Sequence, residues 1–227
     1  MVKYRAEITK DEEIRYISHL DYAALMQRAI CRAHLPAAYS EGFNPHMKIA
    51  FASALAVGVT SDAEYMDMEL TEPLCQPEVF DRLQAQLPAG VKLRQLKLIE
   101  GKHAALMSEV DLAVYSLQVP LLGTADAALQ AAADFNAAAE FVYHRVTPKK
   151  TREIEVKQYI DGKAEVQVSG AELNLAIRIR ITPAGSIKPG EVLAILCHDF
   201  GLPADPAQAL IHRQALLSKG KNLIEIV

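Results

Sequence analysis

The order of strand-like and helix-like segments constrains this 227-residue chain more than any other feature of its sequence. Residues 2–9 and 64–70 alternate polar and apolar side chains, which predicts strands with one buried face. Apolar side chains recur at helical spacing after residue 18 and again after residue 77. With short extended segments near residues 48–52 and 91–98, the order is strand, helix, strand, strand, helix, strand. This order predicts a split βαβ, ferredoxin-like module.

The second half of the chain repeats this order with one addition. A strand near residues 110–119, an Ala-rich helix, a strand at residues 172–181, a helix at residues 189–200 and a closing strand at residues 214–217 follow one another. Between them, residues 152–160 and 164–168 predict an inserted hairpin that turns at Asp161 and Gly162. The sequence therefore predicts an α+β chain of two tandem ferredoxin-like (βαββαβ) modules with antiparallel sheets, at residues 1–101 and 108–227.

Composition narrows the classes of function. The net charge of −4 argues against a duplex-DNA binder. No apolar run reaches about 18 residues, so no membrane span is expected. The charged, alternating first residues do not resemble a secretory signal, which predicts a cytoplasmic protein. Cys31, Cys75 and Cys197 lie far apart and are expected to be free thiols, with Cys31 structural among apolar helix neighbours.

A helix start is visible at Ser18-His19-Leu20-Asp21. The hydroxyl and the acid three residues later have the spacing of a capping box. An apolar stripe follows it, and Pro36 ends it. The sequence therefore predicts that Ser18 caps a helix beginning near His19.

Two blocks carry a resemblance to a known family. The first is Arg15-Tyr16-Ile17-Ser18-His19-Leu20-Asp21, and the second runs from Tyr39 through Gly42-Phe43-Asn44-Pro45-His46 to Val57-Gly58. Together they resemble the radical-SAM-associated proteins, a family of undetermined function. Met47 departs from the pattern, in which proline follows the histidine.

The resemblance implies a radical-SAM protein as partner, because similar segments are fused to or encoded beside such a protein with a cobalamin-binding-like region. The chain itself lacks the three closely spaced cysteines that hold a radical-SAM iron–sulfur cluster. We therefore expect no cofactor in this chain, and we expect no catalytic activity on its own.

Three polar side chains near these blocks have two interpretations. His19, Asp21 and His46 can hold a metal or act as acid and base. In the alternative interpretation, Asp21 belongs to the helix cap and both histidines make loop hydrogen bonds. We expect no metal site.

The predicted ligand is RNA or another phosphate-bearing molecule. The helix start at Ser18 and His19 offers backbone donors to phosphate. Phe43 can stack on an unpaired base, or it can fold into the core as part of a rigid turn. The predicted binding residues are completed by the flanking cations and by the densest basic run: Arg15, Asn44, His46, Lys48, Lys149, Lys150 and Arg152.

Three functions remain open from the sequence. The first is an accessory module that works with a radical-SAM partner and binds RNA or another phosphate-bearing ligand. The second is a protein-interaction or substrate-presenting subunit that needs no nucleic acid. The third is a His-dependent hydrolase or nuclease built on His19 and His46, for which the sequence supplies no nucleophile.

Overall fold

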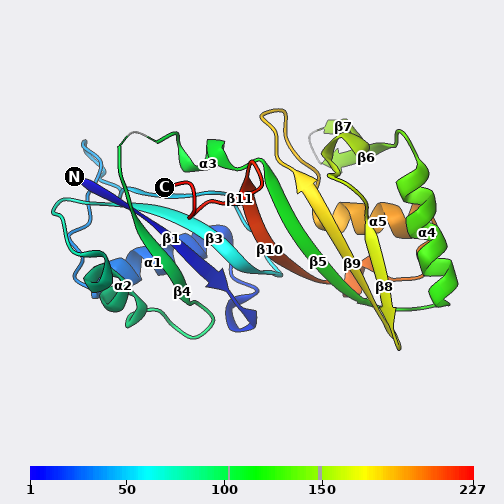
Figure 1. Ribbon diagram of the computed structural model, residues 1–227, viewed down its shortest axis with the longest axis horizontal. Coiled ribbons are helices and arrows are strands. Elements are labelled where there is room, and N and C mark those ends of the chain that lie inside the picture. Colours follow the sequence, from blue (N-terminus) through cyan, green and yellow to red (C-terminus); the bar gives the residue numbers. More distant parts are fainter. Residues whose placement is uncertain (102, 148–149) are drawn as a thin grey trace. The chain divides into compact units, whose positions relative to one another are not determined.

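The computed structural model describes residues 1–101, 103–147 and 150–227. Within them the fold is α+β, with five α-helices and a mostly antiparallel sheet (Figure 1). The chain divides into two compact units, Met1–Asp111 with Ala215–Val227, and Leu112–Gln214. The last residues of the chain thus belong to the first unit, whereas the domains expected from the sequence put them in the second.

The first unit is built on an antiparallel sheet in the order β4-β1-β3, and β2 pairs with β3. Its elements follow the predicted order of strand, helix, strand, strand, helix, strand. They are β1 (Val2–Lys10), α1 (His19–Arg32), β2 (Ile49–Phe51), β3 (Val59–Leu70), α2 (Gln76–Gln84) and β4 (Leu93–Ile99), followed by α3 (Leu106–Glu109) and, near the end of the chain, β11 (Lys221–Asn222).

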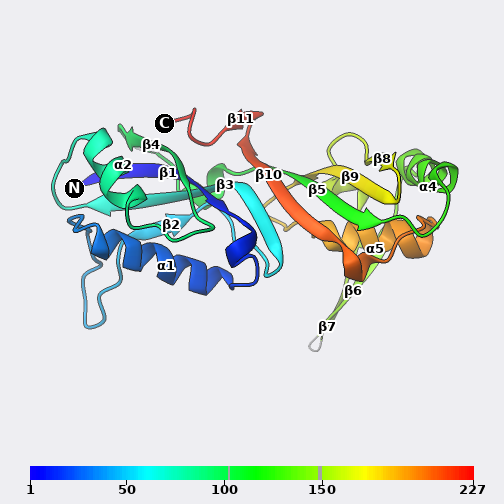
Figure 2. The same ribbon diagram turned by 90° about the horizontal axis from the view of Figure 1, so that it is seen from below.

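The core of the first unit lies between this sheet and its helices. Alternate residues of β1 and β3, such as Tyr4 and Met66, point to the same side and are almost fully buried. The stripe on α1 that contains Tyr22, Met26 and Ile30 packs against them. Figure 2 shows α1 running along this side of the strands. The apolar residues that recur at helical spacing in α1 and at every second position in β1 and β3 therefore pack into one apolar cluster.

The opposite side of the same sheet is also buried, although the sequence predicted a single buried face for β1. Arg5 is fully buried, and its guanidinium contacts both carboxylate oxygens of Asp67, at 2.7 and 3.1 Å. It also lies 2.8 Å from Glu109 and donates to the carbonyl of Leu223 at 3.1 Å. The one-face expectation is wrong because polar side chains pair with each other beneath α3 and the last residues of the chain.

The second unit has the strand order β10-β5-β9-β8. The pairs β5–β9 and β8–β9 are antiparallel, and β6 and β7 form a separate two-stranded sheet. Figure 2 shows this hairpin extending away from the strands of its unit. The elements are β5 (Leu112–Pro120), α4 (Ala125–Ala137), β6 (Val142–Thr147), β7 (Lys150–Glu155), β8 (Glu165–Ser169), β9 (Glu172–Arg180), α5 (Pro189–Asp199) and β10 (Leu210–Ser218), whose residues are shared between the two units.

The inserted hairpin exists, but its strands are not those that the sequence predicted. Residues 142–147 pair with residues 150–155, and β8 pairs with β9 instead of with residues 152–160. The predicted turn at Asp161 and Gly162 is wrong. Asp161 instead binds Arg178 at 2.9 Å and Arg180 at 2.8 Å, which fastens this segment to β9. The segment that contains this turn therefore lies against β9 and does not connect two strands of a hairpin.

Candidate functional site

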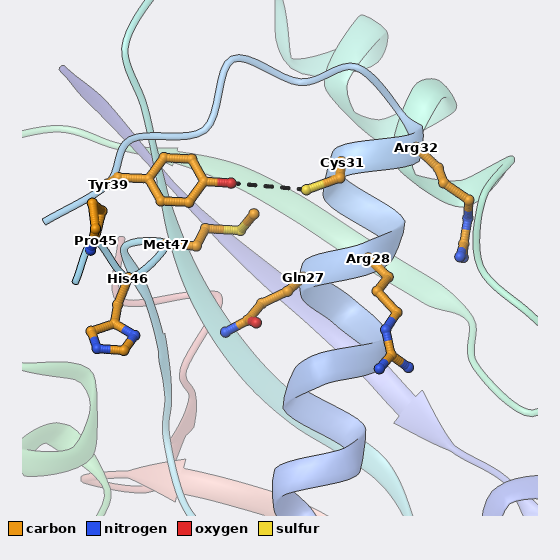
Figure 3. Close-up of a pocket in the computed structure, with 8 residues that line it drawn as sticks. All are labelled: Gln27, Arg28, Cys31, Arg32, Tyr39, Pro45, His46 and Met47. Carbon is orange, nitrogen blue, oxygen red and sulfur yellow. Dashed lines mark hydrogen bonds between the residues drawn. The ribbon is translucent and has the colours of Figure 1, made fainter.

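A surface groove of about 460 Å³ lies between the second half of α1 and the segment that follows it. Figure 3 shows Gln27 and Cys31 extending from α1 toward Tyr39 and His46. In the same view, Arg28 and Arg32 extend from α1 away from Tyr39 and His46. The full lining is Gln27, Arg28, Cys31, Arg32, Tyr39, Pro45, His46 and Met47.

The helix presents these side chains because of its spacing. Gln27 and Cys31 are four residues apart, as are Arg28 and Arg32, so they form two adjacent rows on the solvent-facing side of α1. The core stripe occupies the other side. Arg32 donates to the carbonyl of Gln86 at 2.9 Å, which fixes its guanidinium. The sequence prediction missed these four residues. Their spacing relative to the apolar stripe could have shown that they lie on the exposed side of the helix.

A thiol and a phenol that both line the groove lie close to each other. The Cys31 sulfur lies 3.9 Å from the Tyr39 hydroxyl (Figure 3). This contact raises the pKa of the Tyr39 phenol above its ordinary value. Cys31 is exposed, so its expected structural role among apolar neighbours is wrong. It lies beside the apolar stripe of α1 and outside it.

The loop of residues 40–46 is closed at its base. Tyr39 and Met47 form a bridge, and the Ser40 hydroxyl accepts a hydrogen bond from the His46 backbone at 2.9 Å. Met47 is buried and anchors the end of the loop. Phe43 is fully exposed, which excludes the alternative in which it folds into the core. The loop therefore holds an aromatic ring and the exposed Asn44 in water.

The start of α1 forms the predicted cap and lies away from the groove. The Ser18 hydroxyl accepts from the Asp21 backbone at 3.2 Å and donates to the Asp21 carboxylate at 2.7 Å, which confirms the cap. His19 packs its ring edge-on to Phe51, with centroids 5.2 Å apart. The groove lies further along the helix, since neither Ser18 nor His19 lines it. The structure therefore groups the loop with the second half of α1.

The other predicted binding residues are dispersed. Arg15 is buried and lies 2.9 Å from Glu12. Lys48 lies 3.6 Å from Glu69. These ion pairs reduce the charge that the two cations offer to a ligand.

The basic run lies in the second unit. Arg152 is exposed and donates to the Ala184 carbonyl at 2.9 Å. Lys149 lies outside the described residues, and Lys150 is described only as part of β7. Of the predicted binding residues that the structure describes, His46 is the one that lines the groove.

No metal centre emerges from the described parts of the chain. Within them, no group of three or more His, Cys, Asp and Glu side chains is placed to hold a metal ion. His19, Asp21 and His46 therefore do not form such a group. The described helices also include none that is both long and apolar enough to cross a membrane.

These features define an α+β protein with a surface groove whose lining includes two arginines and a histidine. The chain belongs to the family described as an uncharacterized protein conserved in bacteria (DUF2344), which it matches over residues 3–189. No curated protein matches it.

The solved structures that are similar to it include the following two. The first is a Cbf5-Nop10-Gar1 complex, at 11% identity and a TM-score of 0.48, covering 92% of this chain. This chain spans 48% of that one. The second is an unknown protein from Galdieria sulphuraria, at 9% identity and a TM-score of 0.27, covering 95% of this chain and 98% of that one.

Proposed function

We propose that this protein is an accessory module that binds single-stranded RNA, or another phosphate-bearing ligand, at the groove on α1. The observation that carries the proposal is the composition of the 460 Å³ groove, whose lining includes Arg28, Arg32 and His46. Guanidinium groups suit phosphate oxygens because they combine several hydrogen-bond donors with a positive charge. An imidazole also offers a hydrogen-bond donor to such oxygens.

The position of the two arginines is in one respect unfavourable for binding an anion. They lie in the last turns of α1, where the helix dipole is negative. That dipole is equivalent to about half an elementary charge, so two guanidinium groups outweigh it. With a net charge of −4 on the whole chain, the favourable field is confined to this patch. We therefore expect weak binding that falls steeply with added salt.

The adjacent loop supplies a stacking platform. Phe43 is fully exposed on a loop whose base is closed by the contacts between Ser40 and His46. A base stacked on an aromatic ring contributes about 1–3 kcal/mol. An exposed ring on the loop whose last residues line the groove suits an unpaired nucleotide better than a duplex, whose bases are already stacked.

We also propose that each unit is a ferredoxin-like module. In the first, the order β4-β1-β3 with β2 beside β3 supports this. In the second, the order β10-β5-β9-β8 supports it once the β6–β7 hairpin is set aside. The radical-SAM partner is likewise part of the proposal and rests on the resemblance of residues 15–58. Co-purification of such a protein from cell extract at high salt is its test.

The binding test is a titration of the full chain with a labelled single-stranded RNA at two salt concentrations. We expect Arg28→Ala to weaken binding and to reduce the salt slope by about 0.7, the value for one lost phosphate contact on a single strand. Phe43→Ala should weaken binding at both salt concentrations, because stacking does not depend on counterions. Both side chains are exposed, so neither change should unfold the protein.

The matched control is Lys163→Ala, which removes an exposed cation of the second unit. It should leave the RNA affinity and the salt slope nearly unchanged. Equal losses in Arg28→Ala and Lys163→Ala would mean that charge anywhere on the chain suffices, and would reject the groove. No RNA binding by the wild-type chain would leave the protein-interaction function as the better proposal.

A further inference from the structure

A second surface of the first unit, distinct from the groove on α1, has the features of a peptide-binding edge. β4 stands at the end of the strand order, and among the described residues it pairs with β1 alone. An edge strand directs a row of backbone N–H and C=O groups away from the sheet. An extended chain can pair with such a row.

A groove of about 390 Å³ runs beside this edge. It is lined from α2 by Gln76, Pro77, Phe80 and Asp81, and from β4 by Gln95, Leu96 and Lys97. Figure 1 shows α2 lying next to β4. Leu96 is buried, and Phe80 is partly buried against the same core. The groove therefore has an apolar wall where α2 meets the strand.

The two sides of β4 differ in chemistry. Leu96 is opposite Ala6 of β1 and so faces the helix-covered core. Lys97 is opposite Arg5 and so faces the other side of the sheet. Arg94 is half-exposed and lies 3.4 Å from Asp62. A strand added to β4 would thus meet apolar groups on the side of Leu96 and the Lys97 side chain on the other.

We propose that this edge binds an extended peptide in which apolar and acidic residues alternate. Successive side chains of a strand point to opposite faces. The apolar residues would enter the groove at Pro77, Phe80 and Leu96, and the acidic ones would lie near Lys97. Asp81 on the rim of the groove repels an acidic residue on that side, so it disfavours the arrangement in which the acidic face of the peptide enters the groove.

The same charges disfavour the obvious competitor, a second copy of this chain paired β4 to β4. Such pairing brings the cations of one β4 close to those of the other, and like charges on paired strands are destabilising. An acidic strand meets the same cations favourably. The charge pattern of β4 therefore selects a different partner and discourages self-association.

The test uses the full chain and a fluorescent, end-blocked peptide of seven alternating valine and glutamate residues. Its two comparison probes are the same peptide with lysine for glutamate, and a peptide of the same composition with the valines grouped. Fluorescence anisotropy gives the affinity, and hydrogen exchange locates the peptide. We expect binding of the alternating glutamate peptide, with new protection at residues 93–99.

A charge reversal at the edge makes the test specific. Lys97→Glu should weaken the glutamate peptide by about two- to tenfold, the range for one exposed charge pair turned from attraction to repulsion. It should strengthen the lysine peptide in the same range. Lys163→Glu is the control, with the same substitution at an exposed site of the second unit, and should change neither affinity.

Several outcomes overturn the proposal. They are no binding of the glutamate peptide, equal binding of the grouped peptide, protection outside β4, and equal behaviour of Lys97→Glu and Lys163→Glu. Protection of β4 that rises with protein concentration in the absence of peptide would instead assign this edge to a dimer.

Discussion

Removing the buried guanidinium of Arg5 should destabilise this protein more than any change of an exposed cation. Arg5→Met keeps the apolar stem and deletes the charge. The side chain is fully buried and contacts Asp67, Glu109 and the Leu223 carbonyl. The variant leaves two carboxylates without their cation beneath the covered side of the sheet. Stranding one partner of a buried ion pair costs about 3–5 kcal/mol.

That loss is large compared with the whole stability of a domain, which is about 5–15 kcal/mol. With a urea slope of about 2 kcal/mol per molar, the unfolding midpoint should fall by roughly 1.5–2.5 M. Circular dichroism measures the midpoint. Hydrogen exchange at residues 2–10 and 219–227 would show whether the loss is local, because Arg5 joins β1 to the end of the chain.

The matched control is Arg94→Met, which removes a half-exposed cation 3.4 Å from Asp62. It should cost less than about 1 kcal/mol. The double variant Arg5→Met with Asp67→Asn should cost less than the sum of its single changes, because Asn removes the stranded charge. Equal costs for Arg5→Met and Arg94→Met, or strict additivity in the double variant, would refute the reasoning.

Three further predictions concern the cap, a buried acid and the thiols. Ser18→Ala should lower the free energy of unfolding by about 0.5–2 kcal/mol, since it removes the bond to the Asp21 backbone; an unchanged urea midpoint would contradict it. Burial raises the pKa of Glu7, so the folded state holds its proton above the ordinary carboxyl pKa and stability should fall as pH rises through that window. Glu7→Gln should therefore gain stability relative to wild type as pH rises from about 4.5 to 7, and a pH-independent difference between their urea midpoints would count against this. Burial raises the pKa of Cys197 to about 11, so iodoacetamide at pH 8 should alkylate exposed Cys31 before Cys197, as followed by mass spectrometry of the peptides; the reverse order would contradict the burial.

Local rules located most of the elements of the first unit. The Ser18 cap and the apolar stripe containing Tyr22 and Met26 are properties of neighbouring residues, so the start and the buried side of α1 could be read from the sequence. The same rules failed at Asp161 and Gly162, where the turn preference was real but the carboxylate is bound to Arg178 and Arg180 of β9. A contact 17 residues away in the sequence leaves no local signal.

In the candidate site, too, some features follow from local sequence and others depend on distant contacts. The sequence by itself determined the loop of residues 40–46 and its aromatic Phe43, because turn-forming residues act over a few positions. Only the tertiary structure decided that this loop lies beside Gln27 and Cys31 and not beside the helix start at Ser18. It also decided that both sides of β1 are buried, since Arg5 meets partners 62 and 218 residues away along the chain. Alternation specifies which side chains share a face of a strand, whereas what covers that face depends on segments that are distant in the sequence.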